Sequence, residues 1–376
     1  MKEMSEIDKN FSYGNKFPGK TDLYRIPDPR FSLYGVKYYE GEGFLRMPLS
    51  VAKEVSDNIE ILAHHTSGGR LFFKTNSKCI GIRVRYKYLT KLSNAELSAS
   101  GFVLIEEIGE NRKYVKILPP SFNADEGYNF VADVSEYLND KDSDEMRSYI
   151  LYFPICQRVA ELAVELEEGS RVERVEKYGD TLPMLYYGSS ITEGFCAGRA
   201  DNTYEAFIEK WTGVDFINLG FSGNGKGEDR MIEYLSGIKC SVFVCDYNHS
   251  GIDLDYFERQ IEKLYRSFRA AQPTTPILFM SKTCIFTDKD RLDNANSDKV
   301  IRHVTQEKII YKTYSDAVAR GDKNVYFLSG IDMLQDLTPT DRMSAANDAD
   351  HLNELGFYIM AKKILEKLRE IPKLLK

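Results

Sequence analysis

Four short segments in the second half of the chain contain the residue types that acyl transfer requires. They are residues 188–194, 218–225, 246–249 and 348–353. Acyl transfer by a serine needs a nucleophile, a base that removes its proton, an anion that orients the base, and hydrogen-bond donors for the oxyanion. The four segments together offer candidates for each of these groups.

The candidate nucleophile and its base come from the first and the last of these segments. Ser190 follows an apolar run and is the candidate nucleophile, although serine at that place could also merely cap a helix. His351 is the candidate base. Asp348, three residues earlier, can orient its imidazole from within one loop turn, with Asp350 as the competing acid. These residue types predict a Ser-His-Asp triad.

The middle segments supply candidate donors for the oxyanion. We expect the backbone N–H groups of Ser190 and Gly223 and the side-chain amide of Asn248 to form the oxyanion hole. Glycine at 223 would let the backbone approach the substrate oxygen without a Cβ in the way. Asn248 could instead stabilise the turn that follows it.

Candidate substrate contacts lie next to these donors. They are Phe221, Tyr247 and His249, the last directly after Asn248. Phe195 and Trp211 are further aromatic candidates, although packing between helices explains Trp211 better.

The four segments resemble the conserved blocks of the SGNH (GDSL-like) hydrolase superfamily. Gly188-Ser189-Ser190 is similar to the Gly-Asp-Ser block, and Gly223 and Asn248 match the glycine and asparagine of the next two blocks. Asp348 and His351 match the Asp-x-x-His block. The resemblance spans residues 183–370 in the family's order, and four blocks in order are far more specific than any one of them.

Two positions depart from the family pattern. Ser189 stands where the family usually has aspartate, and Leu352 replaces the proline that often follows the histidine. Neither change removes a catalytic group. The resemblance therefore implies a serine esterase that needs no metal or organic cofactor.

The amino-terminal half has a narrower resemblance. Gly19 and Asp22-Leu23-Tyr24 are similar to a Gly-x-Asp-Leu-Tyr element that precedes a jelly-roll in certain two-domain members, with the glycine one residue further away here. Together with residues 218–225, this resembles carbohydrate acetylesterases, the mannan-deacetylating enzymes above all. The resemblance implies a carbohydrate-binding-like jelly-roll and an acetylated oligosaccharide, in particular a manno-oligosaccharide, as substrate.

Two other functions stay open. The same triad could act on lipid or aryl esters, and the chain could be a carbohydrate-binding protein that has lost its catalysis. The sequence does not indicate the sugar, the acetyl position or the oligomeric state, a homo-oligomer included.

The elements that must position these residues change in character near residue 180. Earlier runs rich in β-branched and aromatic residues predict strands at 70–75, 79–86, 102–105, 149–153 and 160–166. The last of them alternates as a half-buried antiparallel strand should. Residues 134–138 fit one helical turn. We expect an antiparallel β-sandwich over residues 1–175, which the resemblance above implies is a jelly-roll.

Later runs are short and almost continuously apolar, which is typical of parallel strands buried on both faces. They are residues 184–187, 215–219, 241–245, 277–280 and 324–328. Amphipathic helices are expected between them at 303–319 and 354–368, and around the apolar face of Phe257, Ile261, Leu264 and Phe268. This alternation predicts a doubly wound α/β domain over residues 183–376, with its site at the carboxyl ends of the strands. The resemblance to the SGNH hydrolases implies that this domain is their three-layer, flavodoxin-like hydrolase domain. Residues 172–183 would join the two domains.

Length and composition exclude several classes of protein. A chain of 376 residues fits two domains. A net charge of −7 excludes a broadly basic surface and argues against nucleic acid or anionic membrane as the main partner. The absence of a long apolar window and the acidic start predict a cytoplasmic protein. Six scattered cysteines without a CxxC pair indicate reduced thiols.

Two other site types fit the sequence poorly. Residues 220–226 nearly match the motif of a phosphate-binding P-loop, but Gly227 stands where a serine or threonine is needed for Mg²⁺. His64-His65, His249 and His303 lack the carboxylate spacing of a known metal site, so no metal is predicted.

Overall fold

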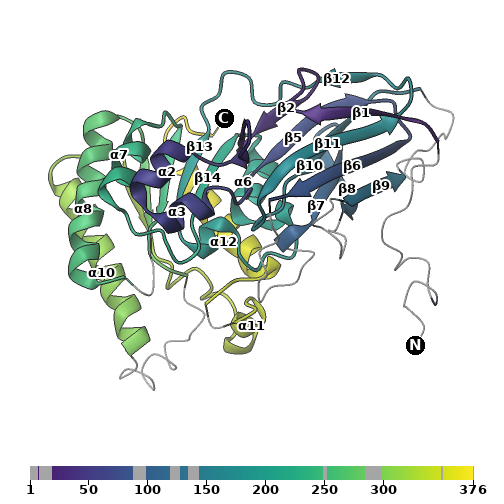
Figure 1. Ribbon diagram of the computed structural model, residues 1–376. Coiled ribbons are helices and arrows are strands. Elements are labelled where there is room, and N and C mark those ends of the chain that lie inside the picture. Colours follow the sequence, from purple (N-terminus) through teal and green to yellow (C-terminus); the bar gives the residue numbers. More distant parts are fainter. Residues whose placement is uncertain are drawn as a thin grey trace. The chain divides into compact units, whose positions relative to one another are not determined.

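The computed structural model describes residues 7, 19–87, 99–118, 128–133, 144–248, 252–283, 298–348 and 350–375. The chain divides into two compact units (Figure 1). Unit 1 comprises Met1–Arg46, His64–Gly179 and Arg199–Asp201, and unit 2 comprises Met47–Ala63, Asp180–Gly198 and Asn202–Lys376.

Unit 1 contains two antiparallel sheets. The first has the order β1 (Thr21–Ile26), β11 (Val159–Glu167), β6 (Cys79–Tyr86) and β9 (Tyr128–Asp133). The second has the order β12 (Val172–Arg174), β5 (Arg70–Thr75), β10 (Arg147–Tyr152), β7 (Phe102–Ile108) and β8 (Asn111–Leu118), and β2 (Ser32–Tyr34) also pairs with β5. A short hairpin joins β3 (Lys37–Tyr39) and β4 (Gly43–Leu45).

One hydrophobic core includes side chains from both sheets, such as Ile82 and Val164 of the first and Phe73 and Leu104 of the second. This confirms the predicted antiparallel β domain. The predicted alternation of β11 is confirmed on its inward face, because Leu162, Val164 and Leu166 lie in the core. On the outward face Glu161 is exposed, but Glu165 is buried, contrary to the prediction. Its carboxylate accepts hydrogen bonds from Arg83 and Thr21, whose side chains help to cover it.

Unit 2 is built on five parallel strands in the doubly wound order β14-β13-β15-β16-β17. They are β13 (Met184–Gly188), β14 (Phe216–Gly220), β15 (Val242–Asp246), β16 (Ile277–Met280) and β17 (Val325–Leu328). Its helices are α2 (Leu49–Val55), α3 (Asp57–Leu62), α5 (Ser190–Glu193), α6 (Tyr204–Thr212), α7 (Asp229–Gly237), α8 (Leu254–Ala271), α10 (Asp298–Ala319), α11 (Pro339–Ser344) and α12 (Glu354–Arg369). The predicted α/β fold with a parallel sheet is confirmed.

Helix α8 shows how sequence produces these elements. Asp253 caps its amino end by accepting a hydrogen bond from the Tyr256 N–H at 2.8 Å. The predicted apolar face is fully buried, with Phe257 and Phe268 at 0% exposure. The helix ends at Ala271, two residues before Pro273, because a proline has no N–H donor for a helical hydrogen bond and disfavours helical backbone in the residue before it.

Helices α2 and α3 belong to unit 2, although we predicted residues 1–175 to form one domain. Their apolar residues Val51, Ala52 and Ile59 lie in the same hydrophobic core as Leu185 and Phe243 of the parallel sheet. Helix α2 packs against α7. Both helices are too short for their apolar spacing to indicate which core they join.

Three predictions fall on residues that the structure does not describe: the helical turn at 134–138, the candidate substrate contact His249 and Cys284. The five described cysteines are all buried free thiols. Among the described helices, none combines the length and hydropathy needed to cross a bilayer.

Candidate active site

The first three sequence segments leave the parallel sheet at aligned positions. Gly188, at the end of β13, pairs with Gly220 of β14 on one side and with Asp246 of β15 on the other. The chain therefore leaves three neighbouring strands at the same edge. The fourth segment, residues 348–353, comes just before α12.

Ser190, His351 and Asp348 form a continuous chain of hydrogen bonds at this edge. Ser190 is the first residue of the short helix α5, and its Oγ lies 2.9 Å from the Nε2 atom of His351. The Nδ1 atom of His351 lies 2.8 Å from Oδ2 of Asp348. Because an ionised carboxylate only accepts, the proton belongs on Nδ1, and Nε2 is left to accept from the serine.

Backbone contacts hold Asp348 in this role. Its Oδ1 atom accepts from the backbone N–H groups of Asp350 and His351, both at 2.7 Å. Partial burial raises the pKa of the Asp348 carboxyl, but the hydrogen bonds from the His351 ring and these two N–H groups outweigh it and lower the pKa below its usual value. The competing acid Asp350 pairs instead with Lys282 at 2.7 Å.

The candidate oxyanion donors differ in their present partners. The Gly223 N–H donates to the Ser189 hydroxyl at 3.2 Å, so that hydroxyl would have to give way to an oxyanion. The Asn248 side chain is 6% exposed and has no hydrogen-bond partner among the described residues. A buried amide without a partner costs about 1–3 kcal/mol, so Asn248 remains a candidate donor to a bound ligand.

The turn after β14 packs onto the nucleophile turn without space for side chains. A Cβ on Gly225 would lie 2.3 Å from the Gly188 carbonyl oxygen, and a Cβ on Gly220 would lie 2.1 Å from the Glu193 nitrogen. Glu193 of α5 also binds this turn, because its carboxylate accepts from both the N–H and the hydroxyl of Ser222. The backbone of residues 220–225 is thereby tied to the helix that carries Ser190.

Glu193 is a site residue that the sequence analysis missed. Its signal was an acidic residue in the turn that carries the candidate nucleophile, three residues after Ser190. An acid there also fits an ordinary helix, in which it would face solvent, so the sequence alone did not distinguish it.

Asp246, at the end of β15, is a second buried acid near this edge. The Thr192 hydroxyl donates to its Oδ2 atom at 2.9 Å. Burial raises the pKa of the Asp246 carboxyl to about 7, although the hydrogen bond from Thr192 and the charge of Lys282 oppose the rise.

The predicted substrate contacts Phe221, Tyr247 and His249 are not placed at a substrate surface by the described structure. Phe221 and Tyr247 are both fully buried in the core of unit 2, where Tyr247 packs against Phe257 with ring centroids 5.0 Å apart. The prediction that these two residues contact substrate is therefore not supported, because neither exposes a surface to it. His249 lies outside the described residues. Phe195 is half-buried and packs edge-on against the His351 ring, with ring centroids 4.8 Å apart. An aromatic side chain therefore lies beside the candidate base.

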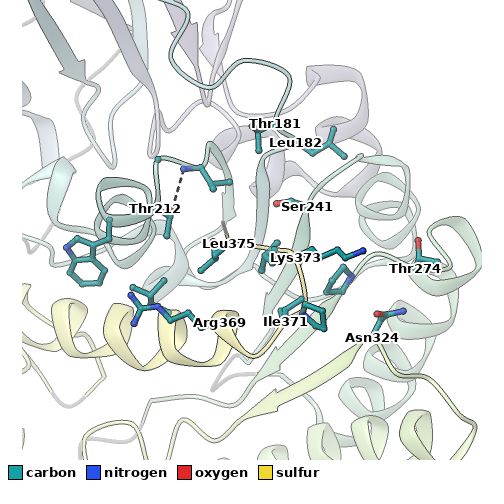
Figure 2. A pocket seen from close by; sticks show the side chains of 17 residues that line it. Thr181, Leu182, Thr212, Ser241, Thr274, Asn324, Arg369, Ile371, Lys373 and Leu375 are labelled. Carbon is teal, nitrogen blue, oxygen red and sulfur yellow. Dashed lines mark hydrogen bonds between the residues drawn. The ribbon is translucent and has the colours of Figure 1, made fainter. Parts of the chain in front are cut away.

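A cavity of about 690 Å³ lies elsewhere in unit 2 (Figure 2). Its walls include Leu182, Ser241 and Asn324, which stand just before β13, β15 and β17. The cavity therefore opens at the amino ends of the parallel strands, opposite to the edge with Ser190. Trp211 of α6 also lines it and meets Tyr358 of α12 edge-on, with ring centroids 5.5 Å apart, as the helix-packing explanation predicts.

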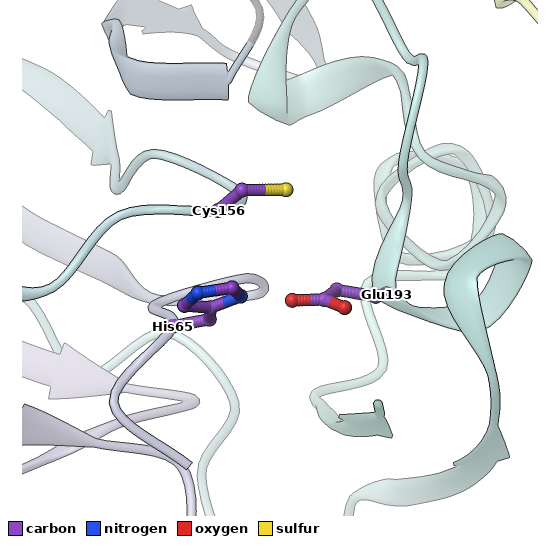
Figure 3. A group of neighbouring side chains, drawn as sticks. All are labelled: His65, Cys156 and Glu193. Atoms are coloured by element: carbon purple, nitrogen blue, oxygen red, sulfur yellow. The ribbon is translucent and has the colours of Figure 1, made fainter. Parts of the chain in front are cut away.

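Two groups of side chains in the described part of the chain contain metal-binding atom types. In unit 1, the His65 imidazole and the Cys156 thiol lie within 4.8 Å of each other (Figure 3). Glu193, also drawn there, belongs to unit 2, where Ser222 occupies its carboxylate. Two donors in unit 1 are too few for a metal site. The second group, Cys196 with Asp348 and His351, lies wholly in unit 2.

Comparison with known families gives two matches. Residues 181–369 match the model of the GDSL-like lipase/acylhydrolase family, and residues 26–172 match the model described as the N-terminus of SGNH-hydrolase-type esterases. A search of curated proteins finds no match.

Solved structures share the whole fold. A candidate GDSL-like lipase from Bacteroides ovatus is 23% identical, with a TM-score of 0.80 over 95% of this chain and 99% of that one. A salicylyl-acyltransferase from a tetracycline biosynthetic pathway is 18% identical, with a TM-score of 0.72 over 93% and 97%. An acetyl xylan esterase from the rumen bacterium Butyrivibrio proteoclasticus is 12% identical, with a TM-score of 0.54 over 93% and 98%. At these identities the likeness concerns the fold.

Proposed function

The chain belongs to the GDSL-like lipase/acylhydrolase family, and from this premise we propose that it is a serine esterase that removes O-acetyl groups from oligosaccharides. The main support is the hydrogen-bonded chain from Ser190 through His351 to Asp348, with contacts of 2.9 and 2.8 Å. Such a chain provides a nucleophile, a base and an anion that orients the base.

The reaction follows from these contacts. Ser190 Oγ attacks the ester carbonyl carbon while its proton passes to His351 Nε2, and Asp348 stabilises the imidazolium that forms. Asn248 and the backbone N–H groups of Ser190 and Gly223 stabilise the negative charge on the carbonyl oxygen. The sugar alcohol leaves with the proton from His351. Water, activated by the same imidazole, then releases acetate and regenerates the serine.

The substrate class rests on weaker support than the triad. The fold is shared with an acetyl xylan esterase, and the amino-terminal match belongs to SGNH-type esterases. Phe195 beside His351 offers an apolar surface on which a small acyl group could pack. Within this class we favour acetylated manno-oligosaccharides, in line with the sequence resemblance.

Acetate release from acetylated manno- and xylo-oligosaccharides tests the proposal. Wild-type protein should release acetate, and Ser190→Ala should release none above background. Ser315→Ala should match wild type, because Ser315 is a half-buried residue of α10 whose hydroxyl donates to the Lys312 carbonyl oxygen of the same helix. The faster of the two substrates identifies the sugar class. Activity on a short aryl ester alone would support the proposed triad but contradict the proposed sugar substrate. No activity on any ester would contradict the esterase.

A further inference from the structure

A buried thiol lies beside the acid and the base of the candidate triad. Cys196, in the turn after α5, is 6% exposed. Its sulfur, an Asp348 carboxylate oxygen and a His351 ring nitrogen all lie within 4.8 Å of one another. The proposed esterase reaction uses no thiol, so the reaction itself does not explain this placement.

The backbone holds Cys196 against the loop that carries the acid and the base. Cys196 has a φ of +74°, in the left-handed region that favours glycine. The Asn347 side chain donates to the Cys196 carbonyl oxygen at 3.2 Å, which ties the turn to the residue before Asp348.

We propose that Cys196, Asp348 and His351 form a Zn²⁺ site that switches the enzyme off. Thiolate, imidazole and carboxylate are the ligands that Zn²⁺ takes in proteins, at about 2.0–2.3 Å. Tetrahedral bonds of that length put donor atoms roughly 3.3–3.8 Å apart. Donor pairs that lie within 4.8 Å of one another therefore need to approach by about 1.5 Å at most. The Asp348 side chain is 51% exposed, which leaves an approach for the ion and for a water as fourth ligand.

Zinc at this site would block the reaction through the histidine tautomer. In the working enzyme Nδ1 carries the proton and faces Asp348, and Nε2 accepts from Ser190. Zinc bound to Nδ1 would leave the single proton of the neutral imidazole on Nε2, which then cannot accept the serine proton. The thiol would release its proton to solvent, so the ion and its two anionic ligands balance in charge.

Metal binding can be tested without any activity. Co²⁺ replaces Zn²⁺ in such sites, and a thiolate ligand gives it a charge-transfer band in the near ultraviolet. We expect Co²⁺ to produce this band in wild type and in Cys240→Ser, a matched control at another buried thiol, but not in Cys196→Ser. Cys196→Gly is a second variant whose backbone suits the positive φ. A band of equal intensity in the Cys196 variants, or no band in wild type, would overturn the site.

Inhibition tests the switch, which rests on the proposed esterase. Each protein is titrated with ZnCl₂ and compared with its own rate in EDTA. Loss of a residue that hydrogen-bonds to a metal ligand typically weakens metal affinity by about 10- to 100-fold. Loss of the ligand Cys196 itself should therefore weaken inhibition by zinc by at least that factor. Equal zinc sensitivity in wild type and both Cys196 variants would overturn the switch. If the wild-type protein shows no esterase activity, the proposed function is contradicted. The Co²⁺ band would still show whether the metal site exists.

Discussion

At the scale of single residues, chemistry depends on which neighbour each group meets. Ser190 is a nucleophile candidate because His351 Nε2 lies 2.9 Å from its oxygen. Asp348 rather than Asp350 orients the histidine because Lys282 engages the latter. Asn248 has no partner among the described residues, whereas Gly223 already donates to a hydroxyl.

Removal of the Asn248 amide should reduce turnover without a matching loss of stability. We expect Asn248→Ala to lower kcat about 100-fold, or about 3 kcal/mol, because one oxyanion donor is lost. Its KM should change little. Replacing a buried, unpartnered amide by a methyl group should leave the thermal midpoint close to that of wild type. Steady-state kinetics and thermal melting measure both effects.

Asn324→Ala is the matched control, because Asn324 lines the cavity at the amino ends of the strands. It should retain wild-type kcat. An Asn248→Ala variant that is fully active would remove this residue from the oxyanion hole.

Asp246 should make the stability of the protein fall with rising pH. Its pKa is about 7 in the folded state and about 3.9 in an unfolded chain, so between these values the folded protein holds a proton that the unfolded chain has lost. The stability contribution therefore falls as pH rises from about 4 to about 7, and stays low above that. Asp246→Asn cannot ionise but can still accept from Thr192.

Urea unfolding of both proteins at pH 5 and pH 8 measures this effect. From pH 5 to pH 8, the free energy of unfolding of the variant should rise by about 2–3 kcal/mol relative to that of wild type. A constant difference between the two proteins would show that Asp246 keeps an ordinary pKa.

At the scale of elements, the site depends on how closely two turns approach. The turn after β14 lies on the turn after β13, and both the glycines of residues 220–225 and the Glu193 carboxylate maintain this contact. The strands bring the turns to one edge because their ends are in register. The candidate oxyanion donor at Gly223 is therefore positioned by β13 and α5 as much as by its own loop.

Gly225→Ala should separate these turns. Its Cβ would lie 2.3 Å from the Gly188 carbonyl oxygen, so the backbone must shift. We expect kcat/KM to fall by about tenfold or more and the free energy of unfolding to fall by about 1–3 kcal/mol, as overpacking does.

Gly237→Ala is the control, because a Cβ there meets open space at the end of α7. It should keep full activity and gain up to about 1 kcal/mol of stability. If both glycine variants behave alike, the close approach of the turns has no catalytic importance.

At the scale of the whole molecule, the hydrophobic core of unit 2 draws on distant parts of the sequence. Residues 47–63 supply α2 and α3 to that core, more than 120 residues before β13. A domain boundary placed only by composition therefore omits part of the structure.

A fragment of residues 183–376 should be much less stable than the full chain. Burial of a valine or isoleucine side chain contributes about 1.5–3 kcal/mol, so the loss of Val51 and Ile59 alone removes about 3–6 kcal/mol. Whole domains are stable by only about 5–15 kcal/mol. Circular dichroism during thermal melting measures the difference, and a peptide of residues 47–63 added in trans should restore part of it. A fragment with the same melting temperature as the full chain would contradict the assignment of α2 and α3 to this core.

The sequence by itself determined the fold class and the candidate triad. Continuous apolar runs predicted β13 to β17, and helical spacing predicted α8, because these patterns are local. Ser190, Asp348 and His351 were found because their types and their places after strands or before a helix are visible in one dimension. The catalytic roles of these residues stay a proposal.

Only the tertiary structure decided which side chains face the site. Tyr247 and Phe221 follow strands just as Asn248 does, yet their rings turn into the core of unit 2. Glu193, Cys196 and the close approach at Gly225 were not predicted, since each depends on a contact between segments far apart in the chain. Direction of a side chain and distance between loops come from packing, which residue type and spacing do not determine.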